Sequence, residues 1–368
     1  MKNPKPKHGP SIYYATDKNV FDALNQHKVD IPTIMKLFQR RNIIVGKKAP
    51  REDLATYFAR LTHDYHDHQD ISARLGIAPR QERVTSMDVT GIDEIEQLKI
   101  AVEQLKQELE STGDVVQISR DGDSLTVEVQ YSTIDYKRSE FAQVQVRDGT
   151  VEFIKSPDGF IVRNTQNEYL NDVRETLLGK IEKVASAPLT KIVVSLFDIP
   201  SPKLRSKFFH ELVSSLPGFT RRDVTDVYVY KAKPEPDDES DDSAPSDPDT
   251  HVERVFLRGS GVTRSELLNE LLDEDDYYIT KISWTAKEIM GSGNDYDIEA
   301  VFADPKNCTG FSFILSGVYP FEDGKTSSRR RAPYKREIDA ISRVIESKSR
   351  ELVTKLRGEF ANSNTGGT

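Results

Sequence analysis

Apolar side chains recur at helical spacing in the first 75 residues of the chain. Positions three and four apart lie on one face of a helix, and three such groups follow one another: Val20, Phe21 and Leu24; Ile31, Ile34, Leu37 and Phe38; Leu54, Phe58 and Leu61. Asp30 suits the N-cap of the second helix, because Pro32 can occupy the first turn without losing a needed hydrogen bond. Residues 40–51 between the second and third helices are too basic and too interrupted by Gly46 and Pro50 to be helical. We therefore expect a helix, an extended loop and a helix here.

From Val115 onward the apolar period changes to two, which is typical of strands with one buried face. Gly122 and Gly159 indicate hairpin turns, and Arg147-Asp148-Gly149 is predicted to be another turn. The expected strands are 115–119, 125–131, 141–146, 151–154, 160–162, 191–197, 225–230, 252–257, 278–286, 296–303 and 311–318; the expected helices are 168–184, 202–215, 264–272 and 335–357. This order predicts an α+β fold, in which a small all-helical module precedes a body of antiparallel sheet and helices.

The body shows a weak internal duplication. The strand at 126–131, a strand ending before Gly149 and the helix at 168–184 resemble the elements at 297–302, 311–318 and 335–356. The elements at 191–197, 202–215 and 225–230 likewise resemble those at 252–257, 264–272 and 278–286. We therefore divide the chain into a flexible basic tail (1–19), a helical module (20–78), an α+β domain (90–232), an acidic disordered linker (233–250), a second α+β domain (251–358) and a flexible tail (359–368).

A helix is predicted over residues 92–111, where apolar side chains step by three and four. Its apolar seam consists of Ile95, Leu98, Val102, Leu105 and Leu109. Two heptads are too few for a stable coiled coil. The seam can instead cover a sheet, or it can serve self-association or a protein partner.

Charge is segregated along the chain. The net charge of the chain is −9. Residues 234–250 alone contain eight acids and no base, whereas residues 1–80 carry 14 Lys and Arg against 8 Asp and Glu. A basic head of this kind favours a polyanionic partner. The segment 234–250 also has no large apolar side chain, so we expect it to be disordered.

The composition narrows the range of cellular compartments in which we expect the protein. No apolar run approaches the roughly 18 residues of a membrane-spanning helix, and the first residues lack the apolar core of a signal peptide. The single cysteine, Cys308, excludes an internal disulfide. We expect an intracellular protein, cytoplasmic or associated with the nucleoid or nucleus, with no membrane partner.

The helix, basic loop and helix at residues 30–62 resemble the SAP motif, a short DNA-binding module. The matching residues are Leu37, Arg41, Ile43, Val45, Gly46, Lys47, Lys48, Ala49, Leu54 and Leu61. Asn42 stands where the family usually has Gly, and residues 50–53 lengthen the approach to the second helix. The resemblance implies contacts to double-stranded DNA from Arg40, Arg41, Lys47, Lys48 and Arg51, in a DNA-handling or mobile-element setting.

A second basic segment, residues 325–336, has six bases and no acid directly before a predicted helix. Clustered arginines, hydroxyl groups and a helix N-terminus are phosphate-binding donors. We therefore add Arg329, Arg330, Arg331, Lys335 and Arg336 to the predicted DNA contacts. The interpretation is a non-enzymatic protein that binds double-stranded DNA largely independently of sequence, as an accessory or adaptor.

Two alternatives stay open. If residues 62–70 are helical, His63, His66, Asp67 and Asp70 share one face, and these residue types can ligate zinc, manganese or iron in a metal-dependent nuclease or hydrolase. The other alternative is a protein-interaction scaffold whose basic loops are merely solvated. No nucleotide-binding or hydrolase motif is present in the sequence, so no cofactor and no catalytic residue is predicted.

Overall fold

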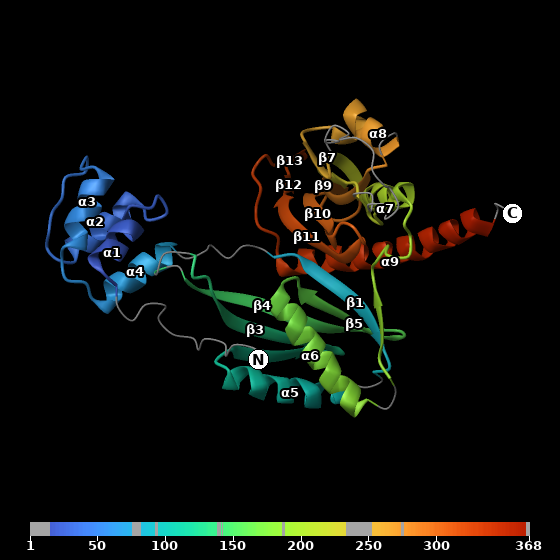
Figure 1. The fold of residues 1–368 in the computed structure, drawn as a ribbon, viewed down its shortest axis with the longest axis horizontal. Helices are drawn as coiled ribbons and strands as arrows, with labels where there is room; N and C mark the ends of the chain where they lie inside the picture. The colour runs from blue at the N-terminus through green and yellow to red at the C-terminus, as the bar shows by residue number, and fades with distance from the viewer. Residues whose placement is uncertain are drawn as a thin grey trace, which may run out of the picture. The chain divides into compact units, whose positions relative to one another are not determined.

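The structure, a computed structural model, describes residues 15–75, 82–92, 95–137, 141, 143–185, 188–232, 252–273 and 276–365. It has an α+β fold, as predicted (Figure 1). The chain divides into two compact units. The first comprises residues 1–80, 93–153 and 172–187, and the second comprises residues 81–92, 154–171 and 188–368. The expected acidic linker at 233–250 lies outside the described residues.

The first unit begins with four short helices around a common apolar core. They are α1 (Asp17–Leu24), α2 (Ile31–Gln39), α3 (Arg51–Ala59) and α4 (Tyr65–Leu75). Phe38 and Phe58 meet edge to face at the centre of this core, with ring centroids 5.2 Å apart. Thr16 and Asn19 form a capping box, so the first helix starts at Asp17, inside the stretch predicted as a flexible tail. Residues 1–14 of that tail lie outside the described part.

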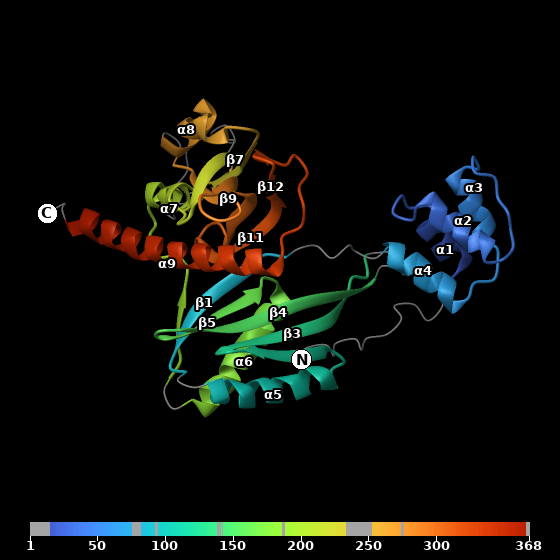
Figure 2. The same ribbon diagram turned by 180° about the vertical axis from the view of Figure 1, so that it is seen from behind.

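The rest of the first unit is a helix-covered antiparallel sheet. Its elements are α5 (Ile95–Ser111), β2 (Val115–Asp121), β3 (Ser124–Ile134), most of β4 (Val144–Ser156) and most of α6 (Glu168–Val184). Figures 1 and 2 show α5 and α6 on the same face of these strands. Residues Leu125, Val127 and Val129 of β3 are buried, whereas Glu128 and Gln130 between and beyond them are exposed.

Two local predictions for this unit have clear outcomes. The apolar seam of α5 faces the core of its own unit, because Leu98, Val102 and Leu105 are almost fully buried there. The predicted turn at 147–149 is wrong: these residues continue β4 and pair with 129–131 of β3. A long partner strand keeps the ladder intact through Gly149, which shows that Asp-Gly alone does not force a turn.

The second unit is built on an antiparallel sheet in the order β5-β1-β11-β10-β9-β7-β8, with β6 pairing beside β1. The strands are β1 (Val84–Thr90), β5 (Gly159–Thr165), β6 (Thr190–Val193), β7 (Phe219–Tyr230), β8 (Arg254–Arg258), β9 (Tyr278–Glu288), β10 (Asp295–Asp304) and β11 (Thr309–Tyr319), and a small hairpin follows from β12 (Phe321–Glu322) and β13 (Lys325–Thr326). The helices are η2 (Val262–Arg264), α7 (Pro202–Ser214), α8 (Glu266–Asp273) and α9 (Lys335–Thr365). Figure 2 shows the long α9 running alongside α7. Both helices cover a core that includes Phe208, Trp284 and Phe302.

Strand β1 is absent from the sequence prediction, which left residues 79–89 unassigned. Its residues alternate between buried Thr85, Met87 and Val89 and half-buried neighbours, and it pairs with β5, β6 and β11. The predicted tail at 359–368 is also helical as far as Thr365. Phe360 packs against the core and Glu359 pairs with Lys207, so these contacts extend the helix.

The order of elements repeats along the chain. The series β1, α5, β2, β3, β4, β5, α6 corresponds to β6, α7, β7, β9, β10, β11, α9. In the second series β8, η2 and α8 are inserted after β7, and β12 and β13 after β11. The boundaries of the two repeats in the structure differ from those of the internal duplication predicted from the sequence. Residues 190–230 correspond to residues 84–121 at the start of the first repeat, rather than to residues 252–286.

Candidate nucleic-acid interface

The loop between α2 and α3 begins with a defined helix end. The N–H of Ile43 donates to the carbonyl of Phe38, and the N–H of Asn42 donates to the carbonyl of Gln39. This pair of bonds is a Schellman motif, which needs a left-handed residue at the position of Asn42. Asn42 has a φ of 57°. Asparagine tolerates that region better than most residues, which suits it to this left-handed position.

Arg41 fastens the start of this loop to α4. Its guanidinium makes paired hydrogen bonds to the Asp67 carboxylate, at 3.0 and 2.5 Å, and it also donates to the carbonyl of Thr62. It lies 4.6 Å above the ring centroid of Phe58. Arg41 was a predicted DNA contact. These bonds already engage its guanidinium inside the molecule.

Arg51 fastens the other end of the loop. One of its nitrogens, Nη1, donates to the carbonyls of Leu24, Gln26 and Val29 at 2.9, 3.1 and 2.5 Å. These carbonyls close the connection between α1 and α2, where helix-end acceptors need partners. Arg51, also a predicted DNA contact, therefore holds two helical segments together.

The middle of the loop is left exposed by these two anchors. Lys47 and Lys48 are exposed, and Ile44 beside them is 95 % exposed. Arg40 at the start of the loop is half-exposed and forms an ion pair with Asp70 at 2.7 Å. Lys47 and Lys48 are thus the loop cations that a polyanion can reach without breaking an internal contact.

The second predicted basic segment, residues 325–336, lies in the other unit. It too contains both arginines with internal partners and exposed cations. Arg331 makes a double hydrogen bond to Glu337, at 2.8 and 2.6 Å. Arg330 pairs with Asp297 at 3.1 Å and lies directly over Gly317, where a side chain would collide with it. Arg329, Lys335 and Arg336 are exposed, and Arg336 extends over the ring of Tyr334.

A carboxylate of the chain itself, that of Glu337, already occupies the N-terminus of α9. Glu337 accepts a hydrogen bond from the N–H of Tyr334 at 2.8 Å. Bonds from Arg331 and from this N–H hold the pKa of the Glu337 carboxyl below its ordinary value. A phosphate would have to displace this carboxylate. The predicted role of the helix end is therefore weaker than that of the exposed side chains around it.

The side chains of the predicted His and Asp cluster each contact a different partner. Asp67 and Asp70 pair with Arg41 and Arg40, while His63 lies against the ring of Phe58. His66 contacts Tyr65 at the surface. Within the described part of the chain, no three His, Cys, Asp or Glu residues are placed to hold a metal ion.

The half-buried His63 and the buried Asp67 have pKa values below their ordinary ones. Burial lowers the pKa of His63, and the positive charge of Arg41 acts in the same direction. Burial works to raise the pKa of Asp67, but hydrogen bonds from Arg41 and from the Asp64 backbone outweigh it and lower that pKa. Both effects favour a neutral imidazole beside an ionised, arginine-bound carboxylate.

Cys308 has no nucleophilic character. It is fully buried, and burial raises the pKa of its thiol to about 12. Little thiolate exists near neutral pH in such an environment.

A polar sheet face in the second unit went unnoticed in the sequence. Glu299 binds Lys281 and Arg83, at 2.7 and 2.8 Å, and Asp297 binds Thr285 at 2.9 Å. A cavity of about 510 Å³ opens beside Asp297 and Glu299. The alternation of polar residues along 281–287 and 295–299 was the available signal. The cations here already neutralise the carboxylates, so no ligand class follows from this arrangement.

Comparison with known proteins adds no relative: no protein-family model matches the chain, and neither does any curated protein. No helix among the described residues is long and apolar enough to cross a membrane.

Proposed function

We propose that the protein binds the phosphate backbone of double-stranded DNA with little preference for sequence, as a non-enzymatic accessory or adaptor in a DNA-handling or mobile-element system. The observation that carries the proposal is the exposed Lys47-Lys48 pair on a loop that Arg41 and Arg51 anchor at its two ends. Anchoring lowers the entropy that the loop loses on binding. Exposed lysines approach phosphates as point charges.

The second unit supplies the additional contacts in this proposal. Arg329, Lys335 and Arg336 are exposed side chains close together in sequence. Among the described residues, none of these three has an ion-pair partner within 4.0 Å. Such residues position a duplex without reading its bases.

The test is duplex binding followed by fluorescence anisotropy over a salt series. Each lost phosphate contact lowers the slope of log K against log salt by about 0.9. The double variant Lys47→Ala/Lys48→Ala should therefore lower the slope by about 1.8 for unrelated duplex sequences alike. Lys183→Ala/Lys203→Ala is the matched control, because it removes two exposed lysines from other elements and should leave the slope unchanged.

Three results would overturn the proposal. Unchanged binding by the Lys47/Lys48 variant would remove the loop from the interface. Loss for one sequence only would indicate base recognition by other residues. Absence of duplex binding by the wild-type protein would favour the protein-interaction scaffold, and metal-dependent cleavage of the duplex would favour the hydrolase.

A further inference from the structure

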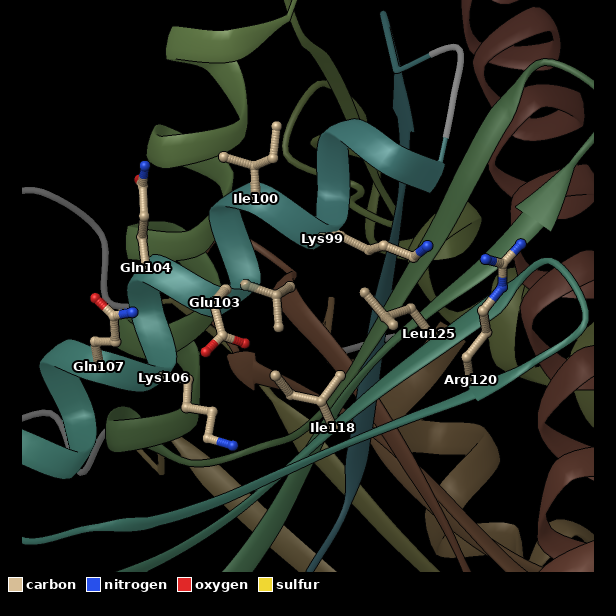
Figure 3. A pocket seen from close by; sticks show the side chains of 10 residues that line it. Lys99, Ile100, Glu103, Gln104, Lys106, Gln107, Ile118, Arg120 and Leu125 are labelled. Atoms are coloured by element: carbon tan, nitrogen blue, oxygen red, sulfur yellow. The ribbon is translucent and has the colours of Figure 1, made fainter.

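A groove of about 750 Å³ runs along one flank of α5 in the first unit. Figure 3 shows Glu103 and Lys106 of α5 above Ile118 of β2 and Leu125 of β3. The opposite flank of α5 faces α6, because Glu108 there pairs with Lys180. The groove therefore opens on the side of α5 that is turned away from the other helix of its unit.

The strand below this groove is at a sheet edge. Within the described part of the chain, β2 pairs with β3 alone. In the second repeat the corresponding strand, β7, is covered on its outer side by β8, which pairs with it over residues 226–230. Natural proteins rarely leave the edge of a regular sheet open. The first repeat lacks the inserted strand that protects the second, so its edge is available to a partner.

The charges along the groove match those of a second copy of α5 that lies antiparallel to the first. Lys99, Glu103, Lys106 and Glu110 alternate in sign along α5. Suppose that two copies of α5 lie antiparallel about a two-fold axis between residues 104 and 105. Lys99 of each copy then faces Glu110 of the other, and Glu103 faces Lys106, so that every pair is of opposite charge. In its own chain Glu103 has no cation within 4.0 Å among the described residues.

We propose that the protein forms a two-fold symmetric dimer in which the β2 strands pair antiparallel, edge to edge, while the two α5 helices lie antiparallel above them and close the groove. The distances are compatible, since neighbouring strands are about 4.8 Å apart and packed helices about 8–10 Å apart. A two-fold contact uses the same patch on both chains, which is what the charge pattern of α5 provides. Ile118, half-buried in the groove, would lie at the dry centre of the contact, and the lysines and glutamates would form its rim.

The test is sedimentation equilibrium of the full-length chain without DNA. We expect the wild type to dimerise. Glu103→Lys and Lys106→Glu should each weaken dimerisation by about tenfold or more, because each places like charges opposite one another twice. The double variant Glu103→Lys/Lys106→Glu restores every pair and should dimerise like the wild type. An equimolar mixture of the two single variants should form heterodimers, since one chain then carries both cations and the other both anions.

Glu270→Lys, an exposed position on α8, is the control that makes the same change in net charge as Glu103→Lys. It should leave dimerisation unchanged. A monomeric wild type at all concentrations would overturn the proposal, as would single variants that dimerise normally. Loss in the single variants without recovery in the double variant or the mixture would also overturn it, because the contact would then not be self-complementary.

Discussion

Arg41 and Arg51 show how a residue type that suggests DNA binding can also hold the fold together. Both lie in a basic loop, yet each guanidinium is directed inward to carbonyls or a carboxylate. A guanidinium has five donors in a fixed fork, so one side chain can hold several acceptors at once. A lysine offers no such fork, which explains why the lysines of this loop are the exposed residues.

Replacement of Arg51 by alanine should destabilise the helical module without altering a surface contact. Three carbonyls lose their charged donor, and such bonds contribute about 1.5–3 kcal/mol. We expect faster hydrogen exchange in α1 and α2, measured by mass spectrometry. Lys48→Ala is the control: it should weaken duplex binding and change stability by no more than about 0.5 kcal/mol. Equal exchange in Arg51→Ala and the wild type would refute the anchoring role.

His63 should make the stability of the same module dependent on pH. Burial lowers the pKa of His63 in the folded state below the ordinary value of 6.5. The unfolded chain therefore binds more protons between those two values, and the free energy of unfolding falls as the pH drops below about 6.5. Hydrogen exchange in α3 and α4 should accelerate over this range. His63→Phe, which keeps a ring beside Phe58, should remove that part of the pH dependence, and a dependence that persists would assign it elsewhere.

At the scale of elements, helices with strong capping and apolar spacing were predictable, and so were strands next to clear turns. The helix at 168–184 was predicted with its observed ends. Strand β1 was missed because four of its seven side chains are hydroxyl-bearing or acidic, and their partners lie far away in the sequence. Asp88 pairs with Arg350, and Thr85 bonds to the carbonyl of Phe311. Contacts between residues more than 200 positions apart leave no pattern in the local sequence.

The candidate site was predictable to a similar depth. Residue type and spacing identified the basic loop between α2 and α3. They did not separate Lys47 and Lys48 from Arg41 and Arg51, because the partners of the arginines lie on α4 and on the α1–α2 connection. That distinction depends on tertiary contacts.

A buried ion pair joins β5 to α9. Arg163 bonds to both oxygens of Glu346, at 2.7 and 2.8 Å, and the two side chains are 5 % and 1 % exposed. Asp339 lies 3.6 Å from the same guanidinium. The buried Glu346 carboxylate therefore depends on Arg163 for charge compensation.

Removal of one partner should cost far more than removal of both. Arg163→Met leaves a buried carboxylate uncompensated and should lower the free energy of unfolding by about 3–5 kcal/mol. Arg163→Met/Glu346→Leu should recover most of that loss, because apolar side chains of similar volume replace both charges. Urea unfolding followed by the fluorescence of Trp284, which is buried in the core of the same unit, measures both variants. A double variant as unstable as the single one would show that the pair stabilises the fold beyond charge compensation.

For the whole molecule, the segregation of charge in the sequence leads to a prediction about affinity. Residues 234–250 carry eight acids, and the proposed DNA contacts are cations. A segment of this charge competes with phosphate for the same surfaces, most strongly where screening is weak. Replacing its acids by Ser and Gly at equal length should tighten duplex binding at about 50 mM salt and have little effect at about 300 mM. Equal affinities of the two proteins at low salt would reduce the segment to a spacer.

Strand β1 is synthesised long before one of its partner strands, β11. The two units take three stretches each in alternation, so the chain crosses between them five times. β1 leaves the ribosome early, but Thr85 meets Phe311 only after 226 more residues. At about 5–20 residues per second, translation of that stretch takes on the order of 10–45 s. Until then β1 can pair with β5 along one edge and with β6 at residues 87–90 of the other edge, so only the start of that second edge, where Val84 pairs with Phe313, stays open. In a nascent chain that ends before β11, the Val84 end of β1 is therefore the part of this strand that still lacks its partner.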